Sequence, residues 1–141
     1  MQKKTVLITL CFTAAVSMLA VAAPSQAATS TTAVAIPPVP VCLCTVGQTV
    51  ILGTGAAETL DGTSAHECII LQGGADTSNA QAGDDTVCGG AGGDTIRGGS
   101  GNDVLFGDGG GDNLTGDSGT DTANGGAGSD TCSAETQISC P

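Results

Sequence analysis

The sequence predicts an all-β fold: a parallel β-roll, built as a right-handed solenoid with two nine-residue blocks in each coil and stapled by disulfides. Three observations predict it: a nine-residue period, a composition too poor in apolar residues for an ordinary core, and an even set of cysteines behind a leader segment. Residues 73–133 hold 14 apolar residues among 61, against 19 glycines. Such a region should stay disordered unless a repeat or a ligand orders it.

The first 27 residues are typical of a secretory signal peptide. Lys3 and Lys4 form a positive start, residues 6–23 are mostly apolar, and Ser25 and Ala27 place small residues at the cleavage positions. We expect cleavage near Ala27, and the alternative is an uncleaved membrane anchor, because the apolar run approaches the roughly 18 residues that span a bilayer. Residues 28–43, rich in Pro, Ser and Thr, then form an extended linker.

The charge balance indicates which partners the chain can bind. After cleavage Arg97 is the only Lys or Arg against 14 Asp and Glu, a net charge of −13. One cation gives no electrostatic basis for binding nucleic acid or anionic lipid. We therefore expect cations as partners, no nucleic acid and no membrane insertion after signal removal. Whether a protein or surface partner exists is not readable from the sequence.

Six cysteines remain after cleavage, an even number in an exported chain, which favours disulfides over a zinc site. Cys132 and Cys140 lie eight residues apart, so they form the first expected pair. A bond between Cys42 and Cys44 would close a strained ring. The sequence therefore predicts links from Cys42 and Cys44 to Cys68 and Cys88, with both pairings open.

The period is plainest from Gly89 onwards, where five consecutive blocks keep Gly at positions 1 and 4, Asp at position 6 and an apolar or small residue at position 8. These blocks read GGAGGDTIR, GGSGNDVLF, GDGGGDNLT, GDSGTDTAN and GGAGSDTCS. The same register continues backwards with fewer matches as far as Cys44. We expect β-roll repeats over residues 44–133, degenerate over 44–79 and regular over 80–133, followed by a C-terminal cap over 134–141.

Each position in the block has a physical role in such a roll. The glycines allow tight, left-handed turns, the Asp supplies a hard oxygen ligand suited to Ca²⁺, and position 8 points inward from a short strand. Because two blocks make one coil, each block stacks on the second block along the chain. The expected inward ladders are Ile51, Ile69, Val87, Leu105 and Ala123 in one sheet, and Leu60, Ser78, Ile96, Leu114 and Cys132 in the other. Five coils would extend about 24 Å.

The repeats resemble the hemolysin-type, or repeat-in-toxin (RTX), calcium-binding family, and in particular its small secreted, cysteine-containing bacterial members. The resemblance covers about residues 44–140 and is most specific in GGAGGDTIRGGSGNDVLFGDGGGD. It implies that each Ca²⁺ lies between stacked turns, held by position-6 carboxylates and by carbonyls of the Gly-rich turns. The implied carboxylates form one row of Asp76, Asp94, Asp112 and Asp130 and a second row of Asp85, Asp103 and Asp121. The implied carbonyls belong to Gly89, Gly90, Gly92, Gly98, Gly99, Gly101, Gly107, Gly110, Gly116, Gly119, Gly125 and Gly128. The intervals within the two rows give five ions.

The resemblance also ranks the remaining acids and cysteines. Glu58 and Glu67 extend the two rows as lesser candidate ligands, because their side chains are longer and Ala56 and Ala65 replace the position-4 glycines. Asp84, Asp108 and Asp117 lie outside position 6, and we expect them to face solvent. Among the open pairings, the family similarity favours Cys44–Cys88, which leaves Cys42–Cys68.

These features together predict a secreted, extracellular, non-catalytic calcium-binding protein whose folding is driven by the ions. An enzyme is disfavoured because His66 is the only histidine and has no motif around it. A type I export signal is disfavoured by the N-terminal signal peptide, because the type I route reads a C-terminal element and needs no such peptide. The alternative is an adhesin, matrix or ice-binding module built on the same roll, although its position-7 threonines are interrupted by Cys68, Val104 and Asn113.

Overall fold

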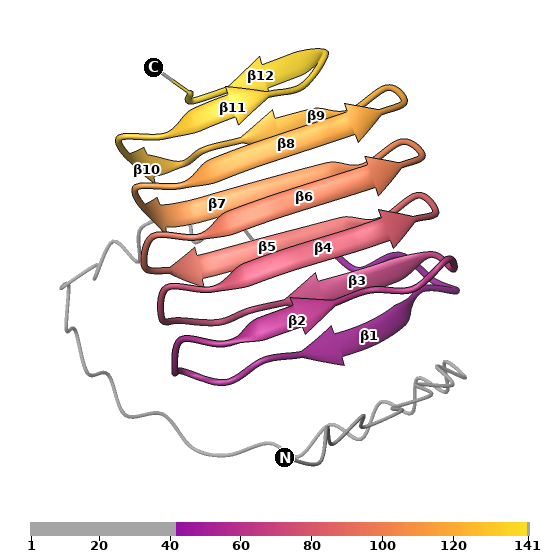
Figure 1. Cartoon of the computed structure of the whole chain (residues 1–141), viewed down its shortest axis with the longest axis horizontal. Coiled ribbons are helices and arrows are strands. Elements are labelled where there is room, and N and C mark those ends of the chain that lie inside the picture. The colour runs from indigo at the N-terminus through magenta and orange to yellow at the C-terminus, as the bar shows by residue number, and fades with distance from the viewer. Residues whose placement is uncertain (1–41, 141) are drawn as a thin grey trace, which may run out of the picture.

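A computed structural model describes residues 42–140, which form a parallel β-solenoid of about five coils with no helix (Figure 1). Its twelve strands are β1 (Thr49–Leu52), β2 (Thr59–Asp61), β3 (Glu67–Ile70), β4 (Thr77–Ala82), β5 (Thr86–Ala91), β6 (Thr95–Ser100), β7 (Val104–Gly110), β8 (Asn113–Ser118), β9 (Thr122–Asn124), β10 (Ala127–Gly128), β11 (Thr131–Ser133) and β12 (Thr136–Ile138). The predicted signal peptide and residues 28–41 of the predicted linker lie outside the described residues. The described part holds no helix of the length and apolarity needed to cross a membrane.

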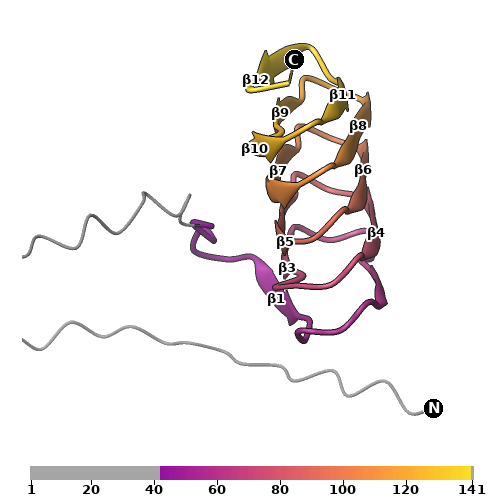
Figure 2. The ribbon, with the colours of Figure 1, turned by 90° about the vertical axis from the view of Figure 1, so that its left-hand side faces the viewer.

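The strands form two sheets that face each other across a thin core (Figure 2). One sheet runs in the order β1-β3-β5-β7-β9-β12, with β10 paired to β7, and the other runs β11-β8-β6-β4-β2. From β1 to β9 successive strands therefore alternate between the sheets, and every pairing is parallel. This confirms the prediction of a parallel roll with two blocks in each coil.

The pairing register places equivalent positions of alternate blocks over one another. Ile69 is aligned with Val87 and Val87 with Leu105 in one sheet, while Ile96 is aligned with Leu114 in the other. The central members of both predicted ladders are buried, and Ile51, Leu60 and Cys132 at the ends pack against them partly buried. Position 8 is thus the inward position, as predicted.

Two further core residues occupy position 1 of their blocks, which sequence reasoning did not assign to the core. Leu71 and Ala80 are both 0% exposed and belong to the same apolar cluster as the ladders. Position 1 therefore also faces inward, and in the five blocks from Gly89 onwards it is Gly. The blocks that begin at Leu71 and Ala80 thus gain apolar contact at a position where the five later blocks have none.

Position-4 glycines allow the turns of neighbouring coils to stack closely. Gly92 has φ +126°, and a Cβ built on it would lie 1.6 Å from the carbonyl oxygen of Gly74 in the coil below. Gly128 repeats this relation to Gly110 at 1.3 Å. No side chain fits in such a contact, which explains why Gly recurs every nine residues.

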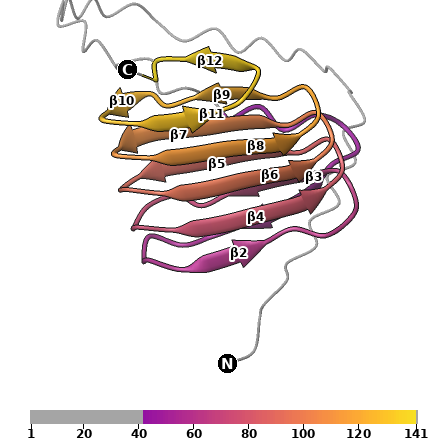
Figure 3. The same cartoon turned by 45° about the horizontal axis from the view of Figure 1, so that its top comes forward.

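The end of the roll that carries the C-terminus is closed by the segment predicted as a cap (Figure 3). There β12 pairs with β9, aligning Thr136 with Thr122, and the disulfide Cys132–Cys140 closes the last loop. That disulfide was predicted from its spacing and is confirmed.

The two N-terminal disulfides differ from the pairing that the family resemblance favoured. The structure joins Cys42 to Cys88 and Cys44 to Cys68, so the expectation of Cys44–Cys88 and Cys42–Cys68 is wrong. The reason is the strand order β1-β3-β5: the segment before β1 runs back over the sheet, so the cysteine nearer β1 meets β3 first. Two extended residues span roughly 7 Å, enough to pass from one strand to the next at about 4.8 Å spacing.

Candidate metal centre

The position-6 carboxylates form two buried rows along the two lines of turns. All seven predicted aspartates are at most 5% exposed: Asp76, Asp85, Asp94, Asp103, Asp112, Asp121 and Asp130. In each row, Oδ1 accepts a hydrogen bond from the backbone N–H of the acid one coil below. Asp94 N–H donates to Asp112 Oδ1 at 2.8 Å, and Asp85 N–H donates to Asp103 Oδ1 at 2.9 Å. The structure thus brings the predicted residues together with one oxygen fixed by the backbone.

The second carboxylate oxygen, Oδ2, is the distinctive feature of these rows. In all seven aspartates it is buried and has no hydrogen-bond partner. Leaving such an oxygen unpaired in a buried site is costly, and a charged one costs more. Seven buried carboxylate oxygens, all without a partner and all at the same block position, fit a group of positive charge, and a hard cation suits the donor set of carboxylate and carbonyl oxygens.

The position-1 glycines provide room for that group. A Cβ built on Gly107 would lie 2.4 Å from Asp112 Oδ2 and 2.6 Å from the carbonyl oxygen of Gly125 in the next coil. A Cβ on Gly98 would lie 2.3 Å from Asp103 Oδ2. The free carboxylate oxygen and a turn carbonyl therefore converge beside a Cα that has no side chain. We call the space between stacked turns a gap and name it by the acid of its lower block, so this gap is the one above Asp112.

The glycines whose carbonyls were predicted as ligands have different places in this arrangement. The position-1 carbonyls of Gly107 and Gly125 lie beside the free oxygens of Asp94 and Asp112. The remaining position-1 glycines, Gly89, Gly98 and Gly116, lie against the acids of their own blocks. The glycines at positions 2 and 4 adopt positive φ and shape the turn: Gly90, Gly92, Gly99, Gly101, Gly110, Gly119 and Gly128.

Burial makes these carboxylates poor anions when no cation is near. It raises the pKa of Asp85 to about 6, against the opposing effect of the hydrogen bond from Glu67 N–H and with a further rise from the charge of Asp103. Burial is also the largest cause of the raised pKa values of Asp94, Asp103 and Asp112, and like charges along each row add to it. A bound cation would offset both the desolvation of the carboxylates and the repulsion between them.

Glu58 and Glu67 differ from the aspartates in their partners. Glu58 Oε1 accepts the backbone N–H of Thr54, and the two carboxylate oxygens of Glu67 accept the N–H and the hydroxyl of Thr63. Their longer side chains thus reach back to donors within their own turns. The structure places both in the rows, as predicted, but engages them with protein donors.

Two acids outside position 6, Asp84 and Glu135, make contacts between coils that the sequence prediction missed. Asp84 is exposed as expected, but its Oδ1 accepts the N–H of Asn102 one coil above at 2.8 Å. Glu135 accepts the N–H of Asp121 at 2.9 Å, replacing the next aspartate of that row at the capped end. The 18-residue spacing of positions 84 and 102 was available as a signal, whereas position 135 is out of register.

Asp108 corrects the expectation that all position-2 acids face solvent. It is only partly exposed, and its Oδ1 is buried with no hydrogen-bond partner. Burial raises the pKa of Asp108, and the charges of Asp112 and Asp94, two acids of one row, raise it further. Asp117, at the same position one block later, is instead exposed and is held by Arg97.

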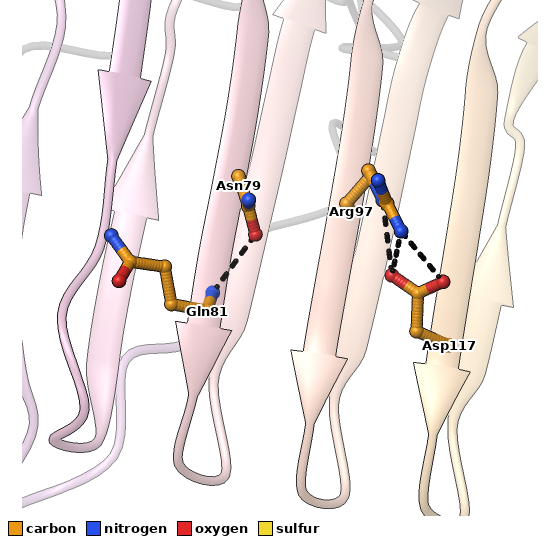
Figure 4. A network of polar contacts seen from close by, with 4 residues as sticks. All are labelled: Asn79, Gln81, Arg97 and Asp117. Atoms are coloured by element: carbon orange, nitrogen blue, oxygen red, sulfur yellow. Dashed lines mark hydrogen bonds and ion pairs between the residues drawn. The ribbon is translucent and has the colours of Figure 1, made fainter.

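The Arg97–Asp117 pair lies on the outer face of the second sheet, near Asn79 and Gln81 (Figure 4). Arg97 Nε and Nη2 donate to the two carboxylate oxygens of Asp117, both at 3.0 Å. Beside it, Gln81 N–H donates to Asn79 Oδ1 at 3.1 Å. Arg97 is the only Lys or Arg among the described residues, and it pairs with a carboxylate that lies outside the two rows.

The comparisons with known proteins agree with this geometry. The family model described as the RTX calcium-binding nonapeptide repeat (4 copies) matches residues 70–105 and 106–136. No curated protein and no solved structure matches the chain significantly. The matched segments contain all seven buried aspartates and the glycines that adjoin them. Residues 70–136 therefore carry RTX calcium-binding nonapeptide repeats.

Proposed function

We propose that the protein is a secreted, non-catalytic calcium-binding roll, in which Ca²⁺ ions held between stacked turns drive folding. The observation that carries the proposal is the repeated, buried and unpartnered Oδ2 of the seven aspartates. When bound, calcium would supply the positive charge that pairs these oxygens. The chain's own residues supply carboxylate and turn-carbonyl oxygens and a sterically open Cα at position 1.

Five gaps meet the full requirement of a free carboxylate below and a complete block above. They are the gaps above Asp76, Asp85, Asp94, Asp103 and Asp112, which supports a count of five ions. Leu71 and Ala80 replace the position-1 glycines of the two lowest of these blocks. Their side chains reduce the space beside Asp76 and Asp85, so we expect those two gaps to bind calcium most weakly.

Calcium dependence follows from the balance of forces in the regular coils. Each block buries one apolar side chain at position 8, and each coil stacks like charges along the rows, so little holds the coils together without cations. Binding free energy then becomes folding free energy. Extracellular calcium modules commonly have dissociation constants of about 10⁻⁴ to 10⁻³ M. A chain with this range would remain unfolded where calcium is scarce and fold after export.

Three disulfides support an extracellular location, because such bonds persist in oxidising compartments. The proposed signal peptide provides the route. A non-catalytic role is supported by the single histidine, whose Nδ1 accepts the backbone N–H of Asp84 at 2.7 Å and so takes part in stacking neighbouring coils.

Calcium counting with folding measured in parallel tests this proposal. The oxidised protein, purified without its leader, would be titrated with calcium from a chelated state and followed by native mass spectrometry and far-ultraviolet circular dichroism. We expect up to five ions and a gain of β signal that tracks them. A complete β spectrum in chelator, or no bound ion at millimolar calcium, would overturn the proposal.

One observation favours a surface function as a second candidate. Sorted by sheet, the position-7 residues of the second sheet form an aligned exposed row of Thr59, Thr77, Thr95, Asn113 and Thr131. Asn113 is the one member of this row that is not threonine, so the row is more regular than the position-7 residues taken in sequence order. Measuring thermal hysteresis with and without calcium tests an ice-binding role: no hysteresis in either state excludes it.

A further inference from the structure

Gln72 and Gln81 show where a side chain at position 2 reaches. Gln72 and Gln81 have φ values of 76° and 78°. Their Nε2 groups donate to the carbonyl oxygens of Gly53 and Gly62, each at 2.6 Å, across the gap to the coil below. A position-2 side chain in this conformation therefore points into the gap and reaches the position-1 carbonyl beneath it.

The other polar groups of these two gaps are also satisfied by protein donors. Thr54 and Thr63 donate to the carboxylates of Glu58 and Glu67, and neither glutamate has a buried oxygen without a partner. The amide hydrogens of Gln72 and Gln81 present positive charge to a carbonyl where a cation would otherwise do so. The gaps above Glu58 and Glu67 thus contain no buried glutamate oxygen without a hydrogen-bond partner.

In the five blocks from Gly89 onwards the same position is Gly in three cases and Asp in two. Gly90, Gly99 and Gly126 place no side chain in the gap. Asp108 and Asp117 have φ values of 69° and 72°, close to those of the glutamines, so their side chains leave the backbone in the same direction. The carboxylate of Asp117 is held by Arg97, whereas Asp108 Oδ1 is buried and unpartnered near Asp94 and Asp112.

We propose that position 2 selects what fills the gap beneath it, and that Asp108 is an additional calcium ligand in the gap above Asp94. Gln72 and Gln81 close their gaps to calcium, glycine leaves a gap open, and Asp108 adds a second free carboxylate to its gap. Asp94 Oδ2 and Asp108 Oδ1 are both buried without a partner, so together they would supply that gap with free oxygens from two acids. This inference rests on the proposed calcium function and makes the gap above Asp94 the tightest of the five, because calcium affinity rises with ligand charge.

Matched substitutions at position 2 test the proposal. Asp108→Gly and Asp117→Gly both install the residue common at this position and both relieve a positive φ, so both should fold in saturating calcium. Calcium titrations by calorimetry, with ions counted by native mass spectrometry, would compare them with the parent chain. We expect Asp108→Gly to weaken the tightest site by about tenfold or more while keeping the ion count, and Asp117→Gly to leave every site within about twofold.

A third variant, Asp108→Gln, tests the selection directly. Its amide should donate to the Gly89 carbonyl, as Gln72 donates to Gly53, and the ion count should fall by one. If Asp108→Gly binds like the parent, or if Asp108→Gln keeps the full count, the inference is wrong while calcium binding itself stands. If the parent chain binds no calcium, the proposed function fails and the inference fails with it.

Discussion

The first two coils and the regular coils above them share one backbone path but differ in what holds neighbouring turns together. In the first two, Ile69 and Leu71 fill the core, Gln and Thr donors satisfy the turn groups, and disulfides link the incoming segment to β3 and, in the coil above, to β5. In the regular coils, glycine replaces the position-1 side chain and the aspartate Oδ2 atoms have no partner. The same solenoid is thus stabilised by covalent bonds and protein hydrogen bonds at one end, and at the other depends on cations.

This comparison suggests an order of assembly. The first coils are held by disulfides, and the polar groups of their turns are hydrogen-bonded. They therefore provide strands with which the regular coils can pair as calcium binds. The conformational entropy lost when Gly-rich turns become ordered is then offset one coil at a time.

The largest expected effect comes from filling a position-4 contact in the regular part. Gly110→Ala would place a Cβ 1.8 Å from the Gly92 carbonyl at φ +148°, so the two turns must separate. We expect the calcium-bound fold to lose more than about 4 kcal/mol of unfolding free energy. Gly47→Ala, at φ +105° with nothing within 4 Å, is the control and should cost about 1 kcal/mol. Equal losses in urea denaturation would contradict the close-stacking argument.

Removing the longest disulfide tests the stapled part. Replacing Cys42 and Cys88 together by Ser opens a link of 46 residues and should lower the unfolding free energy by about 2–4 kcal/mol. The loss should be largest in chelator, where the staple has no help from ions. Replacing Cys132 and Cys140 together, which opens a link of eight residues, is the matched control and should cost less. A greater loss from the short link would reverse the expected importance of the two ends.

Substitutions of position-6 acids should shift the calcium midpoint of folding by different amounts in the two regions. Asp103→Asn keeps the Oδ1 acceptor for Asp85 N–H but removes the charge from the free oxygen. It should raise the calcium midpoint of folding by about tenfold, equivalent to about 1.4 kcal/mol. Glu67→Gln, in the same row but bonded to Thr63, should shift that midpoint by less than about twofold. Equal shifts in the two titrations would mean that Glu67 also binds calcium.

The smallest effect is a pH dependence in chelator. Burial raises the folded-state pKa of Asp85 to about 6 and also raises those of Asp94, Asp103 and Asp112, so the folded calcium-free chain binds protons more tightly than the unfolded chain. Its stability is greatest below the ordinary aspartate pKa and is lost as pH rises through about 6. Circular dichroism in chelator should therefore show more β structure at pH 5 than at pH 7. A β signal that falls on acidification would contradict this sign.

The nine-residue period was sufficient to predict the two sheets, the 18-residue register and the two rows of aspartates, because each depends on one repeated local geometry. The pairing of Cys42 and Cys44 was not predictable in this way. It depends on how the segment before β1 runs back across strands that are not adjacent in sequence. The burial of Asp108 was missed because position 2 faces a turn of the coil beneath, and only the relation between coils shows that a side chain there enters the gap.

Hydrogen–deuterium exchange resolved along the oxidised chain, in calcium and in chelator, tests the contrast between the two regions most directly. We predict that amides of β6, β7 and β8 are protected in calcium and exchange rapidly in chelator, whereas amides of β3 retain much of their protection in both. Uniform protection of all these strands in chelator would show that the regular coils need no calcium and would contradict the account.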